Sequence, residues 1–366
     1  MSKLKTIFGD RVGSLDVVIK NALPLAKPLW YKQYFDVSAP STSLTYSSVI
    51  GETRIQAAAD VVDRSANIPL HGRQGLATLT GDIPAIKVAR ALKESDYRDF
   101  LNLQNLPGVT DQVKFNTALD MIWNDVNYVG DACHLRVEMM ALQAVSTGYL
   151  NINIITNPTG VVLPQIDLLM SASNRKQATI SWDSPATAKP LKDIRAVVKA
   201  GKAIGNTYAK MLMTDVLFDK LIETKEIIDS LKGFFYGPKP GEGFDPMVVT
   251  TLDNVNAFLT RNRLPIIELV DVSIGIMKDG KPTPTNFFDE NNVTFVPAGK
   301  LGTIKNAIAM EKIEPVEHVQ YADYNGVLIS KWKENNPFME WTAGEWNAIP
   351  AFEAIDQSAI LKAVFA

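Results

Sequence analysis

The feature that most restricts the fold of this chain is an uninterrupted helical pattern over residues 111 to 149. Apolar side chains recur there at spacings of three, four and five to six residues, which indicates a helix with a buried stripe. They are Val113, Ala118, Ile122, Val126, Val129, Leu135, Met139, Leu142 and Val145. Thr110 or Asp111 can cap the start, and Gly148 stands where the helix would end. At 1.5 Å per residue this helix would be about 55–60 Å long, which predicts an elongated or plate-like subunit.

Two extended segments precede this helix. Residues 43 to 58, SLTYSSVIGETRIQAA, are rich in Thr, Tyr, Val and Ile and predict one strand. Residues 82 to 92, DIPAIKVARAL, predict its returning partner. The stretch between them has too few large apolar residues for a core of its own, and an isolated two-stranded ribbon is marginal in water. We therefore expect another surface to cover this ribbon.

The segments after the long helix predict a mixed α+β fold with strands on both sides of a helical block. Residues 191 to 264 have the pattern of three or four shorter helices. Residues 266 to 285 predict strand structure with a tight turn at Asp279-Gly280, and residues 292 to 297, NVTFVP, predict another strand. The tail from residue 327 onward mixes strands and turns.

Composition and charge exclude several classes of protein. The chain has 366 residues, of which 46% are apolar and 21% charged, and its net charge is −3. Proteins that hold nucleic acid tightly are basic, so such binding is not expected as the main task; only the N-terminal arm, with Lys3, Lys5 and Arg11, is mildly basic. No stretch approaches the roughly 18 apolar residues of a membrane span. The single cysteine excludes an internal disulfide and favours synthesis in a reducing cytoplasm.

No pattern of catalytic, metal-binding or cofactor-binding residues emerges. The turn in NVTFVPAGKLGTI, residues 292 to 304, lacks the upstream glycine and the hydroxyl of a phosphate loop, so we interpret it as the end of a strand. Cys133 and His134 are adjacent in the long helix, where their side chains diverge by about 100° and cannot act together. We expect no cofactor, no metal and no enzymatic activity.

Five stretches resemble the major capsid proteins of tailed bacteriophages, in the lambda-like group called major capsid protein E. They are LTYSSVIGETRIQAAADVVDRSANIPLHGRQGLATLTGDIPAIKV, EMMALQAVSTGYLNI, DNVNAFLTRNRLPIIELVDVSI with KDGKPTP, NNVTFVPAGKLGTI, and NNPFMEWTAGEWNAIPAF. These are diffuse patterns, but their order and spacing match those of the family from about residue 30 onward.

The resemblance implies the Hong-Kong-97-type capsid fold. The implied parts are an N-terminal arm (1–43), an extended loop (44–92), a peripheral domain (93–190) with a spine helix (111–149), an axial domain (191–300) and a C-terminal segment that returns to the body (301–366). In such a fold a neighbouring subunit covers the extended loop, which would explain the missing core of the ribbon.

The resemblance also implies a function and a set of partners. Copies of the chain would form hexamers and pentamers that tile the icosahedral head of a bacteriophage, a virion assembled in the host bacterial cytoplasm. Portal and scaffold proteins, and decoration proteins where a shell carries them, are expected partners, with weak non-specific contact to packaged double-stranded DNA and no membrane. Inter-subunit contacts are expected at Arg54, Arg64, His71, Arg73 and Lys87. Lys3, Lys5 and Arg11 are expected to face the interior.

Two other functions stay open at this point. A cellular nanocompartment shell of the encapsulin kind would share the fold and differ by its enzyme cargo. A soluble enzyme with an unrecognised site would differ by remaining a monomer or small oligomer.

Overall fold

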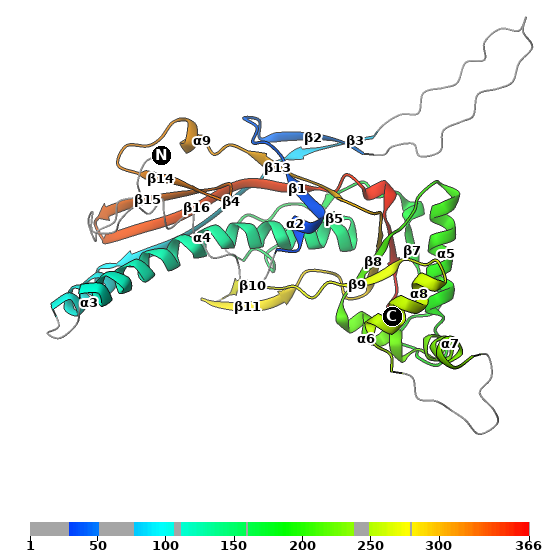
Figure 1. The fold of residues 1–366 in the computed structure, drawn as a ribbon. Helices are drawn as coiled ribbons and strands as arrows, with labels where there is room; N and C mark the ends of the chain where they lie inside the picture. Colours follow the sequence, from blue (N-terminus) through cyan, green and yellow to red (C-terminus); the bar gives the residue numbers. More distant parts are fainter. Residues whose placement is uncertain are drawn as a thin grey trace, which may run out of the picture. The chain divides into compact units, whose positions relative to one another are not determined.

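The computed structural model of the protein describes residues 29–50, 77–105, 111–158, 160–237, 249–278 and 280–365. The chain divides into two compact units. Unit 1 comprises Met1–Tyr46, Gly81–Met139 and Ile304–Pro350, and unit 2 comprises Ser47–Thr80, Met140–Thr303 and Ala351–Ala366. Each unit therefore contains segments that lie far apart in the sequence (Figure 1).

Unit 1 is organised around a six-stranded sheet in the order β1-β13-β16-β15-β14, with β4 also paired to β16. These strands are β1 (Phe35–Val37), β4 (Ala85–Lys93), β13 (Gly302–Ala307), β14 (Gln320–Tyr324), β15 (Val327–Asn335) and β16 (Phe338–Ala351). The short helix α9 (Met310–Ile313) lies between β13 and β14. The tail predicted to mix strands and turns thus supplies the longest strand of the sheet, β16.

The predicted long helix is confirmed as α4, which spans Asp111–Thr147 and follows α3 (Glu94–Asn105). It ends where expected, because Gly148 takes a left-handed conformation with φ 72°. The helix continues unbroken through Gly130, and a Cβ at that position would overlap the ring of Tyr324. The glycine is thus explained by the close approach of Tyr324 on β14.

The predicted pairing of the two N-terminal extended segments is wrong. β2 (Thr45–Ile50) pairs with β3 (Ala77–Asp82), a strand that the sequence pattern did not reveal. The segment predicted to return, β4, instead pairs antiparallel with β16, from Ala85 opposite Asn347 to Lys93 opposite Met339. Pro84 gives the physical reason: it lacks an N–H donor, so the ladder with β2 ends before it and a new strand begins after it.

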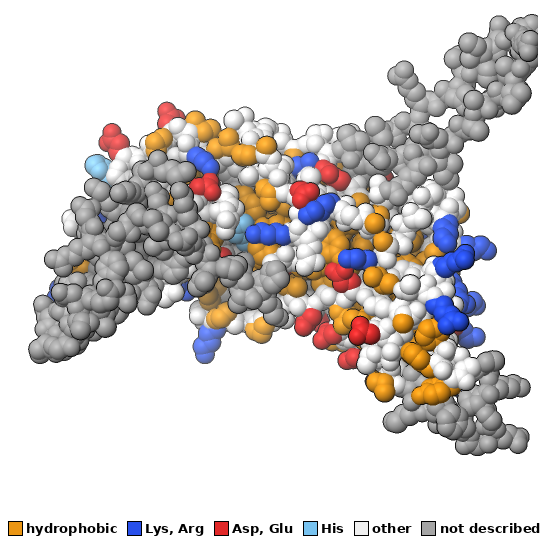
Figure 2. Space-filling model, in the orientation of Figure 1, with side chains coloured by type: hydrophobic (Ala, Val, Ile, Leu, Met, Phe, Trp, Pro, Cys, Tyr) orange, Lys and Arg blue, Asp and Glu red, His pale blue; other side chains and the backbone are white. Residues whose placement is uncertain are grey.

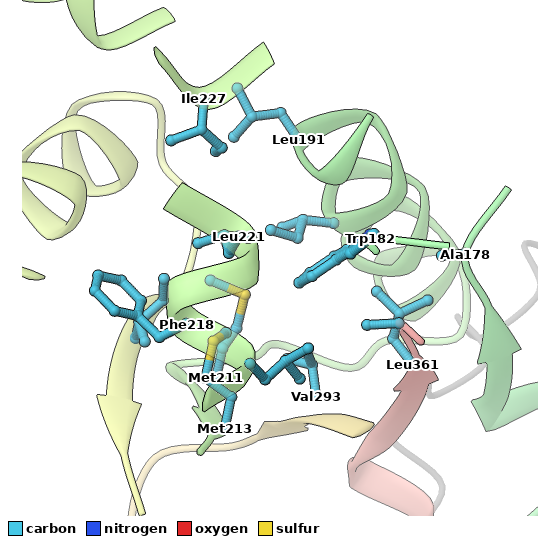
Figure 3. Packing of buried hydrophobic residues seen from close by; sticks show 14 of the residues in the cluster. Ala178, Trp182, Leu191, Met211, Met213, Phe218, Leu221, Ile227, Val293 and Leu361 are labelled. Carbon is cyan, nitrogen blue, oxygen red and sulfur yellow. The ribbon is translucent and has the colours of Figure 1, made fainter. Parts of the chain in front are cut away.

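The described residues of unit 2 after α4 form a five-stranded sheet in the order β7-β17-β12-β8-β9 and four α-helices. The strands are β7 (Arg175–Gln177), β8 (Lys210–Met213), β9 (Ile266–Leu269), β12 (Asn292–Val296) and β17 (Ala359–Lys362). The helices are α5 (Pro190–Ala203), α6 (Asp215–Glu223), α7 (Lys225–Tyr236) and α8 (Leu252–Arg261), which confirms the predicted group of shorter helices. One apolar core lies between these helices and the sheet, and it includes Trp182, Leu191, Phe218, Leu221 and Val293 (Figure 3).

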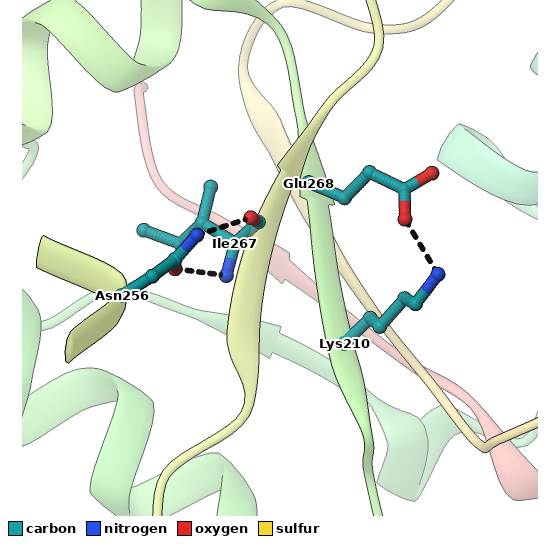
Figure 4. Close-up of polar contacts among 4 residues, drawn as sticks. All are labelled: Lys210, Asn256, Ile267 and Glu268. Carbon is teal, nitrogen blue, oxygen red and sulfur yellow. Dashed lines mark hydrogen bonds and ion pairs between the residues drawn. The ribbon is translucent and has the colours of Figure 1, made fainter. Parts of the chain in front are cut away.

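A side chain of α8 occupies the free main-chain groups of the edge strand β9. Asn256 donates from Nδ2 to the Ile267 carbonyl at 2.9 Å and accepts the Ile267 N–H at 2.7 Å (Figure 4). Lys210 and Glu268 form an ion pair of 2.7 Å between β8 and β9 (Figure 4). Because Asn256 occupies both polar groups of Ile267, another strand cannot pair with β9 at this position.

The described part of unit 2 also contains two small hairpins, β10–β11 and β5–β6. β10 (Ser273–Lys278) pairs with β11 (Lys281–Asn286), and Lys278 lies opposite Lys281, so the strands on both sides of the predicted turn are present. Gly280 has φ 75°, and Asp279 lies outside the described residues. A second hairpin joins β5 (Tyr149–Leu150) to β6 (Ile166–Asp167). The glycine-lysine turn at residues 299–302 lies between β12 and β13, so it ends a strand as the sequence predicted.

Candidate inter-subunit surfaces

The β2–β3 ribbon has one buried and one exposed face in its described part. Tyr46, Ser48 and Leu79 point inward and are 7%, 3% and 3% exposed. The residues between them, Thr45, Ser47, Thr78 and Thr80, are exposed. Strand side chains alternate between faces, so the outer face of the ribbon is a row of hydroxyl groups. The chain itself thus covers the inner face of the described ribbon. Only the outer face remains uncovered, as the sequence predicted for the whole ribbon.

The hydroxyl group of Ser48 holds strand β2 of the ribbon through a bond within unit 2. Ser48 Oγ donates to Glu353 Oε1 at 2.7 Å, and Thr303 Oγ1 donates to the same oxygen at 2.9 Å. Ser48 is buried, whereas Thr303 and Glu353 are half-buried. These bonds hold the strand in place and leave its outer side free of covering strands among the described residues.

Most of the contact residues expected from the sequence lie outside the described residues. This holds for Arg54, Arg64, His71 and Arg73 of the extended loop and for Lys3, Lys5 and Arg11 of the arm. Lys87 is described, on β4. Its Nζ lies 2.6 Å from Glu345 and 3.9 Å from Glu311, and its side chain is 58% exposed. Ion pairs at such exposure contribute little to stability. The ion pairs of Lys87 with Glu345 and Glu311, which lie within unit 1, are therefore weak.

A buried carboxylate holds the start of the described chain against α4. The N–H groups of Trp30 and Tyr31 donate to the two oxygens of Glu138, each at 2.7 Å. The Tyr31 hydroxyl lies 2.9 Å from Nδ1 of His134, whose ring also contacts the edge of Trp346. These residues surround the first turn of α2 (Tyr31–Tyr34), and all are at most 5% exposed. We call Trp30, Tyr31, His134 and Glu138 the arm anchor.

Burial sets the charge states in the arm anchor. Burial raises the pKa of Glu138, while the two N–H bonds and Lys32 act in the opposite direction. Burial, assisted by Lys32, lowers the pKa of His134 to about 4, so the imidazole is neutral near pH 7. Burial and Glu138 raise the pKa of Tyr31, so its hydroxyl stays protonated and donates to His134 Nδ1. A neutral histidine and a carboxylate facing main-chain donors form a structural contact.

The neighbour of His134 contacts a different element, as predicted from the divergence of adjacent helical side chains. Cys133 Sγ lies 3.9 Å from the Ile86 carbonyl of β4. Burial and then Glu345 raise the pKa of the Cys133 thiol to about 12, so it is not a reactive thiolate. Among the described residues, no group of three or more His, Cys, Asp or Glu could hold a metal ion.

A loop that the sequence analysis did not single out exposes aliphatic side chains between β5 and β6. Ile154, Ile155, Val161 and Val162 are 68%, 78%, 71% and 55% exposed. The Asn153 carboxamide oxygen accepts the N–H groups of Ile155 and Thr156 at 2.9 and 3.0 Å, which fixes the turn. An ordered turn that displays aliphatic groups to water is typical of a contact with another macromolecule.

None of the helices within the described ranges combines the length and apolar character needed to cross a bilayer.

Comparison with known proteins gives a family and a fold. Residues 13–363 match the family model of phage major capsid protein E. A proposed prophage capsid protein from E. coli CFT073 superposes with a TM-score of 0.54 at 15% identity, over 92% of this chain and 93% of that chain. A phage-related protein from Bordetella bronchiseptica RB50 gives a TM-score of 0.53 at 12% identity, over 99% and 98%. Comparison with curated protein sequences gives no significant match.

The two kinds of comparison bear on different questions. Likeness at 12–15% identity establishes the fold alone, which is the Hong-Kong-97-type capsid fold. The family match covers nearly the whole chain and also identifies the class, which is one of structural proteins and not of enzymes. Because the match spans α4, both sheets and the β2–β3 ribbon, this chain belongs to the phage major capsid protein E family, whose members are the repeated subunits of the virion's capsid.

Proposed function

We propose that copies of this chain close into five- and six-membered rings, and that these rings tile an icosahedral head around double-stranded DNA. The observation that carries this proposal is the outer face of the β2–β3 ribbon, which no strand among the described residues covers. Head-to-tail contacts between identical subunits join two different surfaces, and they form a closed ring when the rotation between subunits closes. A ribbon from one copy that lies on the next would provide such a contact.

The proposal assigns a role to each part of the chain. Residues 1–43 would be the arm, 44–92 the extended loop, 93–190 the peripheral domain, 191–300 the axial domain and 301–366 the returning segment. Arg54, Arg64, His71, Arg73 and Lys87 stay proposed as contacts between subunits. Lys3, Lys5 and Arg11 stay proposed as interior groups that touch DNA weakly, with portal and scaffold proteins as further partners during assembly in the bacterial cytoplasm.

The outer face of the ribbon provides a direct experiment. Thr78→Arg combined with Thr80→Arg adds two charged side chains to one exposed face of β3. We expect electron microscopy to show shells tens of nanometres wide for the unaltered protein, and an at least roughly tenfold lower shell yield for the double variant.

A matched control separates this effect from a general effect of charge. Thr283→Arg places one arginine on the exposed strand β11, is compared with Thr78→Arg alone, and should leave the yield unchanged. Normal shells from the ribbon variant would overturn the role of the ribbon. An unaltered protein that stays monomeric or forms small oligomers would overturn the proposed assembly.

The contents of the particles distinguish a phage head from a cellular nanocompartment. Particles purified from infected or induced cells should protect double-stranded DNA from nuclease. Particles that carry an enzyme cargo and no DNA would favour the encapsulin-like function.

A further inference from the structure

Helix α5 in unit 2 carries an exposed row of positive charges. Lys192, Arg195, Lys199 and Lys202 are exposed and follow one another at spacings of three, four and three residues. Such spacings place the four side chains on one side of the helix. None of them forms an ion pair with another described residue, and the remaining exposed positions of α5 are alanines. In Figure 2, Lys and Arg side chains gather along the margin where Figure 1 places α5.

Helix α6 carries a row of the opposite sign. Asp215, Asp219 and Glu223 are exposed at spacings of four residues, and only Val216 shares this fully exposed side. The nearest lysine of the helix, Lys220, is already paired with Asp183 at 2.8 Å. The three carboxylates make no ion pair to another described residue. Both helices therefore present charge that the described residues of their unit do not neutralise.

The two rows point away from a core that the helices share. Leu191 of α5 and Phe218 and Leu221 of α6 are buried in the same apolar cluster (Figure 3). α7 packs against both α5 and α6. The rows thus belong to one compact unit, which offers two charged surfaces of opposite sign on two different helices.

The rows are also similar in length and opposite in sign, with four positive groups on α5 and three negative groups on α6. From Lys192 to Lys202 the axial rise is about 15 Å, and from Asp215 to Glu223 it is about 12 Å, at 1.5 Å per residue. Each row would repel an identical row on another copy, which disfavours a twofold contact through either helix. A head-to-tail ring requires every copy to offer two complementary surfaces, and these two rows meet that requirement.

We infer that the α5 row of one subunit docks against the α6 row of the next copy of this chain within a ring. This inference rests on the proposed function and names a contact within it. The contact is electrostatic and exposed at its rim, so it aligns neighbours and weakens as salt shortens the range of the interaction to about 3 Å at 1 M. A nucleic acid would suit the α5 row alone and would leave the carboxylates of α6 unmatched.

The test is assembly of the purified, nuclease-treated full chain at increasing protein concentration. Lys199→Glu and Asp219→Lys each place like charges opposite one another, and each should raise the concentration for half-maximal assembly about tenfold. The double variant restores the pairing with reversed sign and should return to within about threefold of the unaltered protein. Lys176→Glu, on an exposed position of β7, is the control with the same charge change and should assemble normally.

Each outcome decides one question. Dissociated subunits of every variant should unfold at the temperature of the unaltered protein, because Lys199 and Asp219 are exposed. Single variants that assemble like Lys176→Glu, or a double variant that stays as impaired as the single ones, would overturn the docking while leaving ring assembly intact. A defect of Lys199→Glu that appears only when DNA is added back to the nuclease-treated protein would assign the α5 row to nucleic acid and overturn the docking. Failure of the unaltered protein to assemble would instead overturn the proposed function.

Discussion

The arm anchor and the base of the β2–β3 ribbon attach two extended segments in different ways. In the arm anchor, a carboxylate that is 1% exposed accepts two main-chain N–H groups at 2.7 Å. At the ribbon, the half-buried Glu353 accepts hydroxyl groups from Ser48 and Thr303. Removing a buried acceptor leaves its donors without a partner, whereas a half-buried group can exchange its partner for water.

This difference indicates which segment depends on other copies of the chain. Within unit 1, Glu138 accepts both main-chain N–H groups of the arm anchor and His134 Nδ1 accepts the Tyr31 hydroxyl, so residues 30–31 should stay in place before assembly. The described ribbon has an inner face attached through the Ser48 hydroxyl and an outer face of exposed side chains. We therefore expect the arm anchor to control the stability of the subunit and the ribbon to control its assembly.

Among the variants that compare the arm anchor with the ribbon, Glu138→Ala should have the largest effect on the stability of the subunit. It leaves the N–H groups of Trp30 and Tyr31 buried without an acceptor, at a cost of about 3 kcal/mol in the free energy of unfolding. Chemical denaturation of dissociated subunits measures this loss. Amide hydrogen exchange should show much faster exchange at residues 30 and 31.

Glu138→Gln is the matched control, because it keeps one carbonyl acceptor and should lose less stability than the alanine variant. Equal stability of Glu138→Ala and the unaltered subunit would show that the arm anchor contributes nothing, and the contrast with the ribbon would disappear.

The arm anchor should also make the stability of the subunit depend on pH. Burial lowers the pKa of His134 from its usual 6.5 to about 4 in the folded subunit, so only the unfolded chain binds a proton between these values. The contribution of the neutral histidine is complete above about pH 6.5 and decreases as the pH falls toward 4. At pH 5 the loss relative to pH 7 is about 2 kcal/mol.

His134→Gln isolates this contribution, because glutamine can accept the Tyr31 hydroxyl bond and does not titrate. Glu138 and the half-buried Asp131 of α4, which accepts the Tyr324 hydroxyl, have pKa values raised by burial in both proteins, so the comparison removes their effect. The unaltered subunit should lose about 2 kcal/mol more than the variant between pH 7 and pH 5. Identical losses in the two proteins would mean that His134 can be protonated without unfolding.

The helices and strands that the sequence predicted correctly are those whose pattern can be read from residues close together in the chain. Patterns that repeat within a few residues predicted the stripe of α4, the helices of unit 2 and the strands β10 and β11. The pairing of β4 with β16 joins residues about 250 positions apart, and the Glu138 contacts span 107 and 108 positions. No local pattern encodes such distances. The one local signal for the arm anchor was a lone carboxylate in the apolar run EMMALQAV, which is typical of a buried acceptor.

Ser48→Ala should have the smallest effect on the free subunit. It removes one hydroxyl bond to Glu353, whose oxygen still accepts Thr303, so the free energy of unfolding should fall by about 1 kcal/mol. Ser47→Ala, the neighbouring position on the outer face, is the control and should leave that energy unchanged. If the ribbon acts chiefly between copies, both variants should alter assembly more than folding. A loss for Ser48→Ala as large as that for Glu138→Ala would mean that the ribbon, like the arm anchor, is held mainly by its own subunit.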